Sequence, residues 1–216
     1  MIYFFGTSHA ATHLRNAAAL RGVPIAATPE LADVLFVSED TPTDATGKRD
    51  LVPIIDLMNQ ALDYGKQVVL TSQVPPGFTR SFGKDNIFHQ AETLRILDAE
   101  KRAFAPEQII VGGVERAKDA YLDYLHAFRC PIIWTTWENA EFSKIAINMF
   151  LAAQVDCTNR LAAAAGKVGA HWGTVKWALQ NDKRIGPHAY LEPGRWQDST
   201  HLLRDAVTLA EIERAL

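Results

Sequence analysis

Short apolar runs alternate with longer amphipathic segments over the first 136 residues of the chain. Runs with the length of buried parallel strands lie at residues 2–5, 32–38, 68–72, 108–111 and 132–135, with a weaker candidate at 23–27. Segments rich in helix-forming residues lie between them, at 9–20, 51–64, 91–104 and 117–128. Strands that alternate with helices predict an α/β fold with a shortened parallel sheet.

The strand pattern disappears after residue 136. Residues 140–165 predict one long helix, and two shorter helices are expected at 172–180 and 199–216. We therefore divide the chain into an α/β domain, 1–136, and an all-helical domain, 137–216. The long helix is apolar nearly all round, which requires burial on several sides. So short a helical segment covers it poorly, and we expect a homodimer with 137–216 as its dimerisation segment.

Composition and charge exclude several classes of partner. The chain has 216 residues, of which 48% are apolar and 22% charged, as in a soluble globular protein. The net charge is -3 and the basic residues form no runs, so no nucleic-acid partner is expected. The apolar runs are too short to span a bilayer, and the N-terminus lacks a basic region, which predicts a cytoplasmic protein without membrane contact. The two cysteines have no metal-ligand spacing, so no metal site is expected.

The N-terminal strand, glycine turn and helix have the order of a Rossmann dinucleotide-binding fingerprint. The pattern G-x-G-x-x-G/A falls on Gly6, Ser8 and Ala11. Ser8 replaces the second glycine, which lets the backbone approach the pyrophosphate. The acidic residue expected for the ribose is also missing, since Glu30 is the nearest acid. Two interpretations stay open: a weak NAD site, and a structural strand–turn–helix without a cofactor.

A series of segments resembles the UDP-glucose/GDP-mannose dehydrogenase family. Asp182-Lys183-Arg184-Ile185-Gly186 resembles that family's D-x-R-I-G, and Lys144 and Asn148 match the lysine and asparagine of K-Y-x-x-N-x-F-L-A. The other matching segments are Asp40-Thr41-Pro42-Thr43, Thr71-Ser72-Gln73-Val74-Pro75-Pro76-Gly77, Gln90-Ala91-Glu92-Thr93-Leu94-Arg95 and Pro106-Glu107-Gln108-Ile109-Ile110-Val111-Gly112-Gly113. Their order along the chain is what makes the resemblance specific.

The resemblance implies an activity and a set of site residues. Members of that family oxidise a nucleotide sugar twice at C6 with two NAD molecules. By resemblance, Lys144 and Asn148 stabilise developing oxyanion charge, and Glu92 acts as an acid, a base or a water-orienting group. Arg184 would contact the sugar of a neighbouring subunit. The cofactor would lie at Gly6, Ser8, Thr41 and Ser72.

The chain departs from the family where the family has its nucleophile. The family motif G-G-S-C-F-x-K-D corresponds here to residues 198–205, which keep the aspartate as Asp205 but place His201 at the cysteine. Without a thiol no thiohemiacetal forms, so the four-electron oxidation is expected to fail. The family also continues into a second Rossmann-like domain that holds the nucleotide. The resemblance is therefore to a shortened, divergent member.

Each candidate also has a structural interpretation. Lys144 can extend to solvent from the helix, and Asn148 can be a polar residue within a dimer interface. His201 can cap a helix or lie on the surface, and Glu92 can be a solvated residue of a helix. Two functions follow: an NAD-linked oxidoreductase that stops short of the full oxidation, and a catalytically inactive member that binds a ligand or a protein as a homodimer.

Overall fold

Contacts within the chain divide the computed structural model, which describes residues 1–114 and 116–215, into two units. Unit 1 comprises Met1–Pro42 and Arg49–Lys144, and unit 2 comprises Thr43–Lys48 and Ile145–Leu216. Within the described residues, no helix combines the length and the apolar character that crossing a membrane requires.

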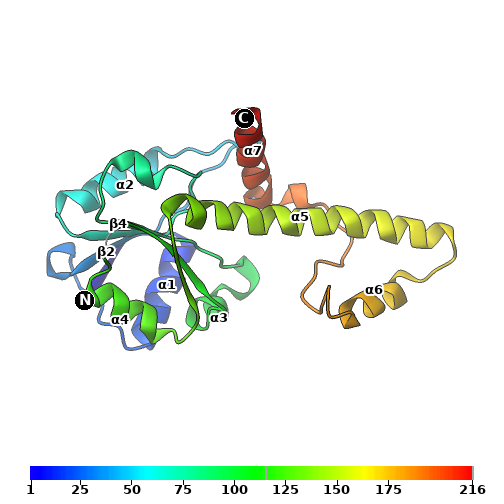
Figure 1. The fold of residues 1–216 in the computed structure, drawn as a ribbon, viewed down its shortest axis with the longest axis horizontal. Coiled ribbons are helices and arrows are strands. Elements are labelled where there is room, and N and C mark those ends of the chain that lie inside the picture. The colour runs from blue at the N-terminus through cyan, green and yellow to red at the C-terminus, as the bar shows by residue number, and fades with distance from the viewer. Residues whose placement is uncertain (115, 216) are drawn as a thin grey trace. The chain divides into compact units, whose positions relative to one another are not determined.

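Unit 1 is built on a six-stranded sheet whose strands are in chain order (Figure 1). All neighbouring strands are parallel except β4 and β5, which are antiparallel. The expected α/β class is confirmed. The strands are β1 Ile2–Phe5, β2 Val34–Val37, β3 Gln67–Leu70, β4 Ile87–Gln90, β5 Ile109–Gly112 and β6 Ile132–Thr135.

Helices cover both faces of this sheet (Figure 1). One face packs against α1 His9–Leu20, α3 Ala99–Phe104 and α4 Asp119–Ala127, and the other against α2 Val52–Asp63. Successive residues of β2 enter opposite cores, as alternation along a strand requires: Phe36 packs toward α1 and α4, and Leu35 toward α2. Three short 3-10 turns complete the unit, η1 Pro29–Leu31, η2 Thr79–Phe82 and η3 Ile96–Asp98.

The structure corrects the sequence prediction at three places in unit 1. Residues 23–27 form no strand: a single parallel bridge joins Ile25 to Ile2, and the adjacent Pro24 has no N–H to extend the ladder. Strand β4 was not predicted, because only two apolar residues precede His89 and Gln90. Residues 91–98 are not α-helical, so the predicted helix begins only at Ala99.

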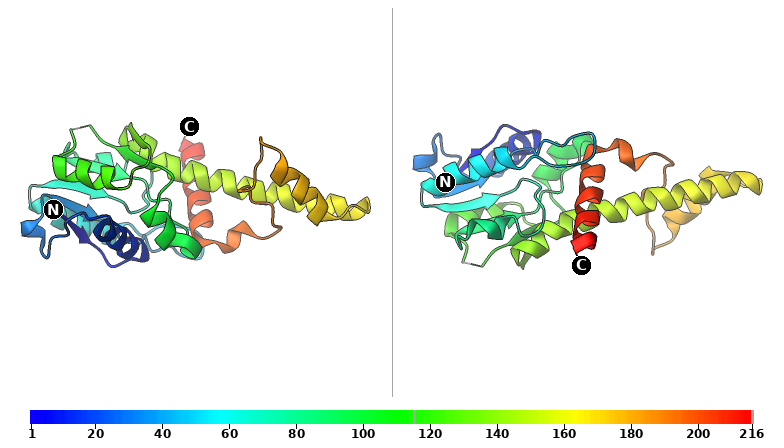
Figure 2. Two further views of the ribbon diagram at one scale, coloured as in Figure 1. Left: turned by 90° about the horizontal axis from the view of Figure 1, so that it is seen from below. Right: turned by 90° about the horizontal axis from the view of Figure 1, so that it is seen from above.

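Unit 2 contains the greater part of α5 Trp137–Lys167, followed by α6 Trp172–Asn181, η4 Trp196–Asp198 and α7 Thr200–Ala215. The expected long helix and its two followers are confirmed. Within this unit α7 crosses α5, as both views in Figure 2 show. The turn at Asp44–Lys48 packs on α7, since a Cβ at Gly47 would lie 2.8 Å from Val207 Cγ2 and 3.2 Å from Leu203 Cγ.

Candidate functional site

The carboxyl ends of β1 and β2 form the place in unit 1 where a parallel sheet binds ligands. From β1 the chain passes through α1 to Ile25 on the outer side of that strand, whereas from β2 it continues through α2 to β3 on the opposite side. Connections that leave in opposite directions open a crevice at the carboxyl ends of the two strands. Gly6 follows β1 at this crevice, and Ser38 and Glu39 follow β2.

The glycine turn has the backbone of the expected fingerprint. Gly6 has φ +101°, and a Cβ at this position would lie 2.2 Å from the carbonyl oxygen of Ser38, so only glycine fits. Ser8 is buried and caps α1: its hydroxyl accepts a hydrogen bond from Ala11 N–H at 3.0 Å and donates one to Ser38 O at 3.1 Å. The Ser8 hydroxyl is thus engaged in holding β1, α1 and β2 together.

A carboxylate lies on this glycine turn. Glu39 Oε2 accepts a hydrogen bond from Thr7 N–H at 2.7 Å and would lie 3.2 Å from a Cβ at Gly6. The other oxygen, Oε1, accepts from Asp40 N–H at 3.0 Å. The backbone N–H of Thr7, between Gly6 and Ser8, is therefore already bonded to a negatively charged carboxylate.

The other two predicted cofactor residues line the same loop after β2. Ser72 follows β3, is buried, and its hydroxyl accepts a hydrogen bond from Glu39 N–H at 2.9 Å. Thr41 is buried two residues after Glu39. Of the predicted cofactor residues, Gly6, Ser8 and Ser72 are thus brought together around the backbone of Ser38 and Glu39.

Glu92 lies in the segment after β4 and not on the helix expected there. Its carboxylate accepts a hydrogen bond from Leu94 N–H, which holds this segment in a turn, and another from Gln73 Nε2 at 3.0 Å. Gln73 belongs to the segment that follows β3, and Arg49 donates to its carbonyl oxygen at 2.9 Å. The predicted acid/base residue is therefore held at the carboxyl edge of the sheet by a side-chain amide.

A second carboxylate, Glu141, organises the turn at Pro75-Pro76-Gly77. Its oxygens accept hydrogen bonds from Gly77 N–H at 2.6 Å and from Thr79 N–H at 2.8 Å. The Glu141 side chain is 1% exposed, and this burial raises the pKa of its carboxyl above the usual value. Nearby Glu138 pairs with Arg80. The first turns of α5 are thereby tied to the segment after β3.

Unit 2 brings together two of the predicted catalytic residues. Asn148 on α5 donates its side-chain N–H to Asp205 Oδ2 on α7 at 2.6 Å, and both residues are buried. Arg204 Nε lies 3.7 Å from Asp205 Oδ1 and is also buried. Because the amide donates to a carboxylate away from water, its orientation is fixed.

The remaining predicted residues lie outside the Asn148–Asp205 hydrogen bond. His201 lies one turn before Asp205 on α7 and is half-buried, and Lys144 lies one turn before Asn148 on α5 and is half-buried. Arg184 is exposed in the loop after α6, and Asp182 holds its guanidinium at 2.6 Å. That ion pair raises the pKa of Arg184.

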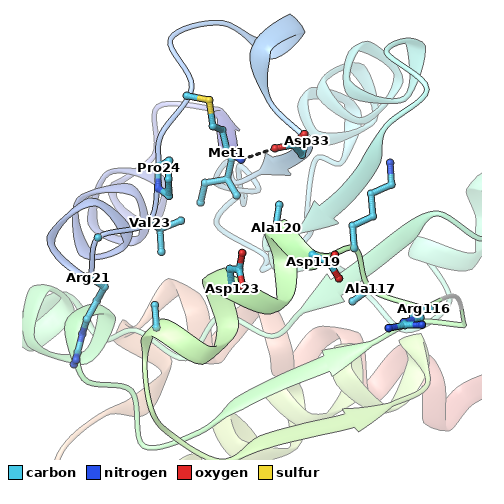
Figure 3. A pocket seen from close by; sticks show the side chains of 14 residues that line it. Met1, Arg21, Val23, Pro24, Asp33, Arg116, Ala117, Asp119, Ala120 and Asp123 are labelled. Carbon is cyan, nitrogen blue, oxygen red and sulfur yellow. Dashed lines mark hydrogen bonds and ion pairs between the residues drawn. The ribbon is translucent and has the colours of Figure 1, made fainter.

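A depression in unit 1 lies at the opposite edge of the sheet (Figure 3). It has a volume of about 940 Å³ and is lined at the amino ends of β1 and β2 and the start of α4 by residues such as Met1, Asp33 and Asp119. None of the predicted site residues lines it. Among the described residues, no three His, Cys, Asp or Glu side chains form a group able to hold a metal ion.

Sequence reasoning missed Glu39 and Glu141. The signal for Glu39 was a charged residue two positions after a continuous apolar strand, at the carboxyl edge where ligands bind. The signal for Glu141 was an acid followed by an apolar helix, three residues before Lys144.

The chain is similar in sequence and in fold to known proteins. Residues 138–215 match the model described as UDP-glucose/GDP-mannose dehydrogenase family, central domain. The chain is 28% identical over 196 residues to the UDP-glucose 6-dehydrogenase YwqF of Bacillus subtilis, which covers 84% of this chain and 44% of that protein. It is 32% identical over 174 residues to an uncharacterized protein of Methanocaldococcus jannaschii, covering 72% of this chain and 19% of that protein. The chain thus spans less than half the length of these relatives.

Two solved structures share the fold. A UDP-glucose dehydrogenase from Pyrobaculum islandicum superposes with a TM-score of 0.76 at 19% identity, covering 99% of this chain and 64% of that one. A GDP-mannose dehydrogenase from Pseudomonas aeruginosa gives 0.70 at 19% identity, covering 89% and 59%. At these identities the likeness concerns the fold.

Proposed function

Because the three comparisons point to the UDP-glucose/GDP-mannose dehydrogenase family, we propose that this chain acts on or binds a nucleotide sugar without completing the four-electron oxidation. The observation that carries the proposal is the buried pair Asn148–Asp205, which has His201 and no thiol on the adjoining turn of α7. The pair supports a retained family site, and the missing thiol limits its chemistry.

The chemical limit follows from the two oxidation steps. Oxidation of the alcohol removes a proton and a hydride and yields an aldehyde. The aldehyde loses a second hydride only after a nucleophile has added to its carbonyl carbon, and a thiol gives a thioester that water then hydrolyses. Cys157 lies on α5 nine residues beyond Asn148, which is about 14 Å along the helix axis. Cys130 belongs to unit 1, in the segment before β6.

The Asn148–Asp205 pair suggests how a sugar oxygen would be held. Asn148 has a second side-chain N–H besides the one that Asp205 accepts. We propose that Asp205 fixes the amide so that this second N–H donates to an oxygen of the substrate. Asp205 is then a positioning residue that holds this donor for the substrate oxygen.

The residues at the glycine turn fit a dinucleotide only in part. The backbone of Gly6 has the required conformation, but the Glu39 carboxylate occupies the Thr7 N–H and places a negative charge beside any pyrophosphate. With Glu39 in this position the turn does not fit the pyrophosphate of NAD.

The test is product analysis with purified protein. The chain is incubated with NAD and a panel of nucleotide sugars, NADH is followed by absorbance, and products are identified by mass spectrometry. We expect an aldehyde with one NADH per sugar, or no turnover. Two NADH and a carboxylate from the unmodified chain would refute the proposal. His201→Cys alone should not restore the full oxidation, because Glu39 still accepts the hydrogen bond of the Thr7 N–H at the glycine turn.

The second candidate function is a non-redox homodimer that binds a nucleotide sugar or a protein. The Glu39–Thr7 hydrogen bond favours this candidate, because a glycine turn already bonded to a carboxylate does not bind the pyrophosphate that an NAD-linked dehydrogenase requires. Calorimetric binding of a nucleotide sugar, with no NADH formed, distinguishes this candidate from the first. Homodimer formation and a cytoplasmic location stay predictions.

A further inference from the structure

We propose that Glu39 is the residue that excludes the pyrophosphate of a dinucleotide from the glycine turn, as an internal anion bound in its place. This inference rests on the proposed function, because it concerns the cofactor site of that same reaction. The Glu39 carboxylate is then the cause of weak NAD binding at this turn, whereas the sequence alone points to Ser8.

The first argument is hydrogen bonding. A pyrophosphate at such a turn is bound by backbone N–H groups at and before the first turn of the helix. Thr7 N–H, the donor within the glycine pattern, already donates to Glu39 Oε2 at 2.7 Å. The Thr7 hydroxyl lies 3.5 Å from the same oxygen. A dinucleotide would have to displace a charge-assisted hydrogen bond before it gained its own.

The second argument is charge. The Glu39 carboxylate oxygen would lie 3.2 Å from a Cβ at Gly6, so the negative group rests directly against the turn. Asp40 follows it and is exposed. A pyrophosphate at the N-terminus of α1 would therefore approach a like charge over a few ångströms, which disfavours binding.

The third argument is that the carboxylate is held in place. Glu39 N–H donates to the buried Ser72 hydroxyl at 2.9 Å, and Glu39 Oε1 accepts from Asp40 N–H at 3.0 Å. Rotation of the side chain away from Thr7 would leave the Thr7 N–H to be satisfied by water or ligand. Ser8 presents no comparable obstacle, since its hydroxyl is directed to Ala11 N–H and Ser38 O.

The experiment compares NAD affinities of four proteins by calorimetry: the unmodified chain, Glu39→Gln, Ser8→Gly and Asp40→Asn. Glu39→Gln keeps the shape and removes the charge. Asp40→Asn removes the same charge from the neighbouring position and controls for net charge. We expect Glu39→Gln to tighten NAD binding by about ten- to a hundredfold, the factor that one charge-assisted hydrogen bond represents. Ser8→Gly and Asp40→Asn should each change it by less than about threefold.

A Glu39→Gln protein that binds NAD no better than the unmodified chain would overturn the inference, as would equal gains from Asp40→Asn. Circular dichroism and the Thr7 amide resonance in a ¹⁵N-labelled sample verify that the variant is folded and that its turn is intact. Glu39→Ala repeats the test should the glutamine itself hold Thr7 N–H. A variant that binds NAD tightly but reduces none of it would favour the non-redox candidate function over the NAD-linked one and leave the role of Glu39 standing.

Discussion

Replacement of Glu141 by alanine should destabilise the chain more than replacement of any exposed acid nearby. The carboxylate is the acceptor for two backbone N–H groups, and one of them, Thr79 N–H, is fully buried. A buried donor left without a partner costs about 1–3 kcal/mol, and the lost bond to Gly77 and the lost methylene burial add to this. We expect Glu141→Ala to reduce the free energy of unfolding by about 3–5 kcal/mol.

Glu141→Gln separates the hydrogen bonds from the charge. Glutamine keeps one acceptor oxygen and removes the negative charge, and it is the burial of this charge that raises the pKa of the native carboxyl. The cost at neutral pH should therefore be about 1 kcal/mol, well below that of alanine.

Urea unfolding followed by tryptophan fluorescence measures both effects, because Trp137 is buried in the same turns of α5 and donates to Ile87 O at 2.9 Å. Glu138→Ala is the matched control: this acid pairs with Arg80 at the surface, so its loss should cost less than about 1 kcal/mol. The reasoning is refuted if Glu141→Ala stays within 1 kcal/mol of the unmodified chain, or if Glu138→Ala is the more damaging change.

Three further predictions concern pH, the unit 2 pair and assembly. Burial raises the pKa of Glu141 in the folded state, so the contribution of this carboxyl to stability is greatest below its unfolded pKa of 4.5 and is lost as pH rises. The free energy of unfolding of the unmodified chain, relative to that of Glu141→Gln, should therefore be higher at pH 4.5 than at pH 7. Asp205→Asn should lower the free energy of unfolding by about 1–3 kcal/mol through loss of the charged bond to Asn148, with Asp198→Asn on the exposed turn before α7 as the neutral comparison. Replacing Met149 and Phe150 by glutamate should yield monomer or aggregate in sedimentation analysis, since Phe150 is 71% exposed on a helix expected at a dimer interface; an unchanged dimer would contradict this.

Sequence patterns predicted strands best where the run of apolar residues is continuous. Residues 2–5 match β1 residue for residue. Strand β4 escaped prediction because its second half is polar yet buried: burial lowers the pKa of His89 to about 3, which keeps it neutral, and Gln90 bonds to the hydroxyls of Tyr121 and Tyr124. Such partners come from a distant helix, which local periodicity does not report.

The same limit applies to the candidate site. The spacing of Lys144 and Asn148 predicts one helix face, and the helix is there. Nothing in that spacing identifies Asp205 as the partner of Asn148, since 57 residues separate them. The helix predicted around Glu92 was wrong because its carboxylate bonds to Leu94 N–H and to Gln73, which competes with a helical turn.

The strictly sequential order of the unit 1 sheet bears on how the chain acquires its structure. Each strand from β2 to β6 hydrogen-bonds to the strand that precedes it in the chain, and a bridge from Ile25 to Ile2 adds to the outer side of β1. No strand has to wait for a later segment to be inserted between two earlier ones. A nascent chain can therefore extend the sheet from its N-terminal edge as synthesis proceeds, with each new pairing closing a loop of modest length.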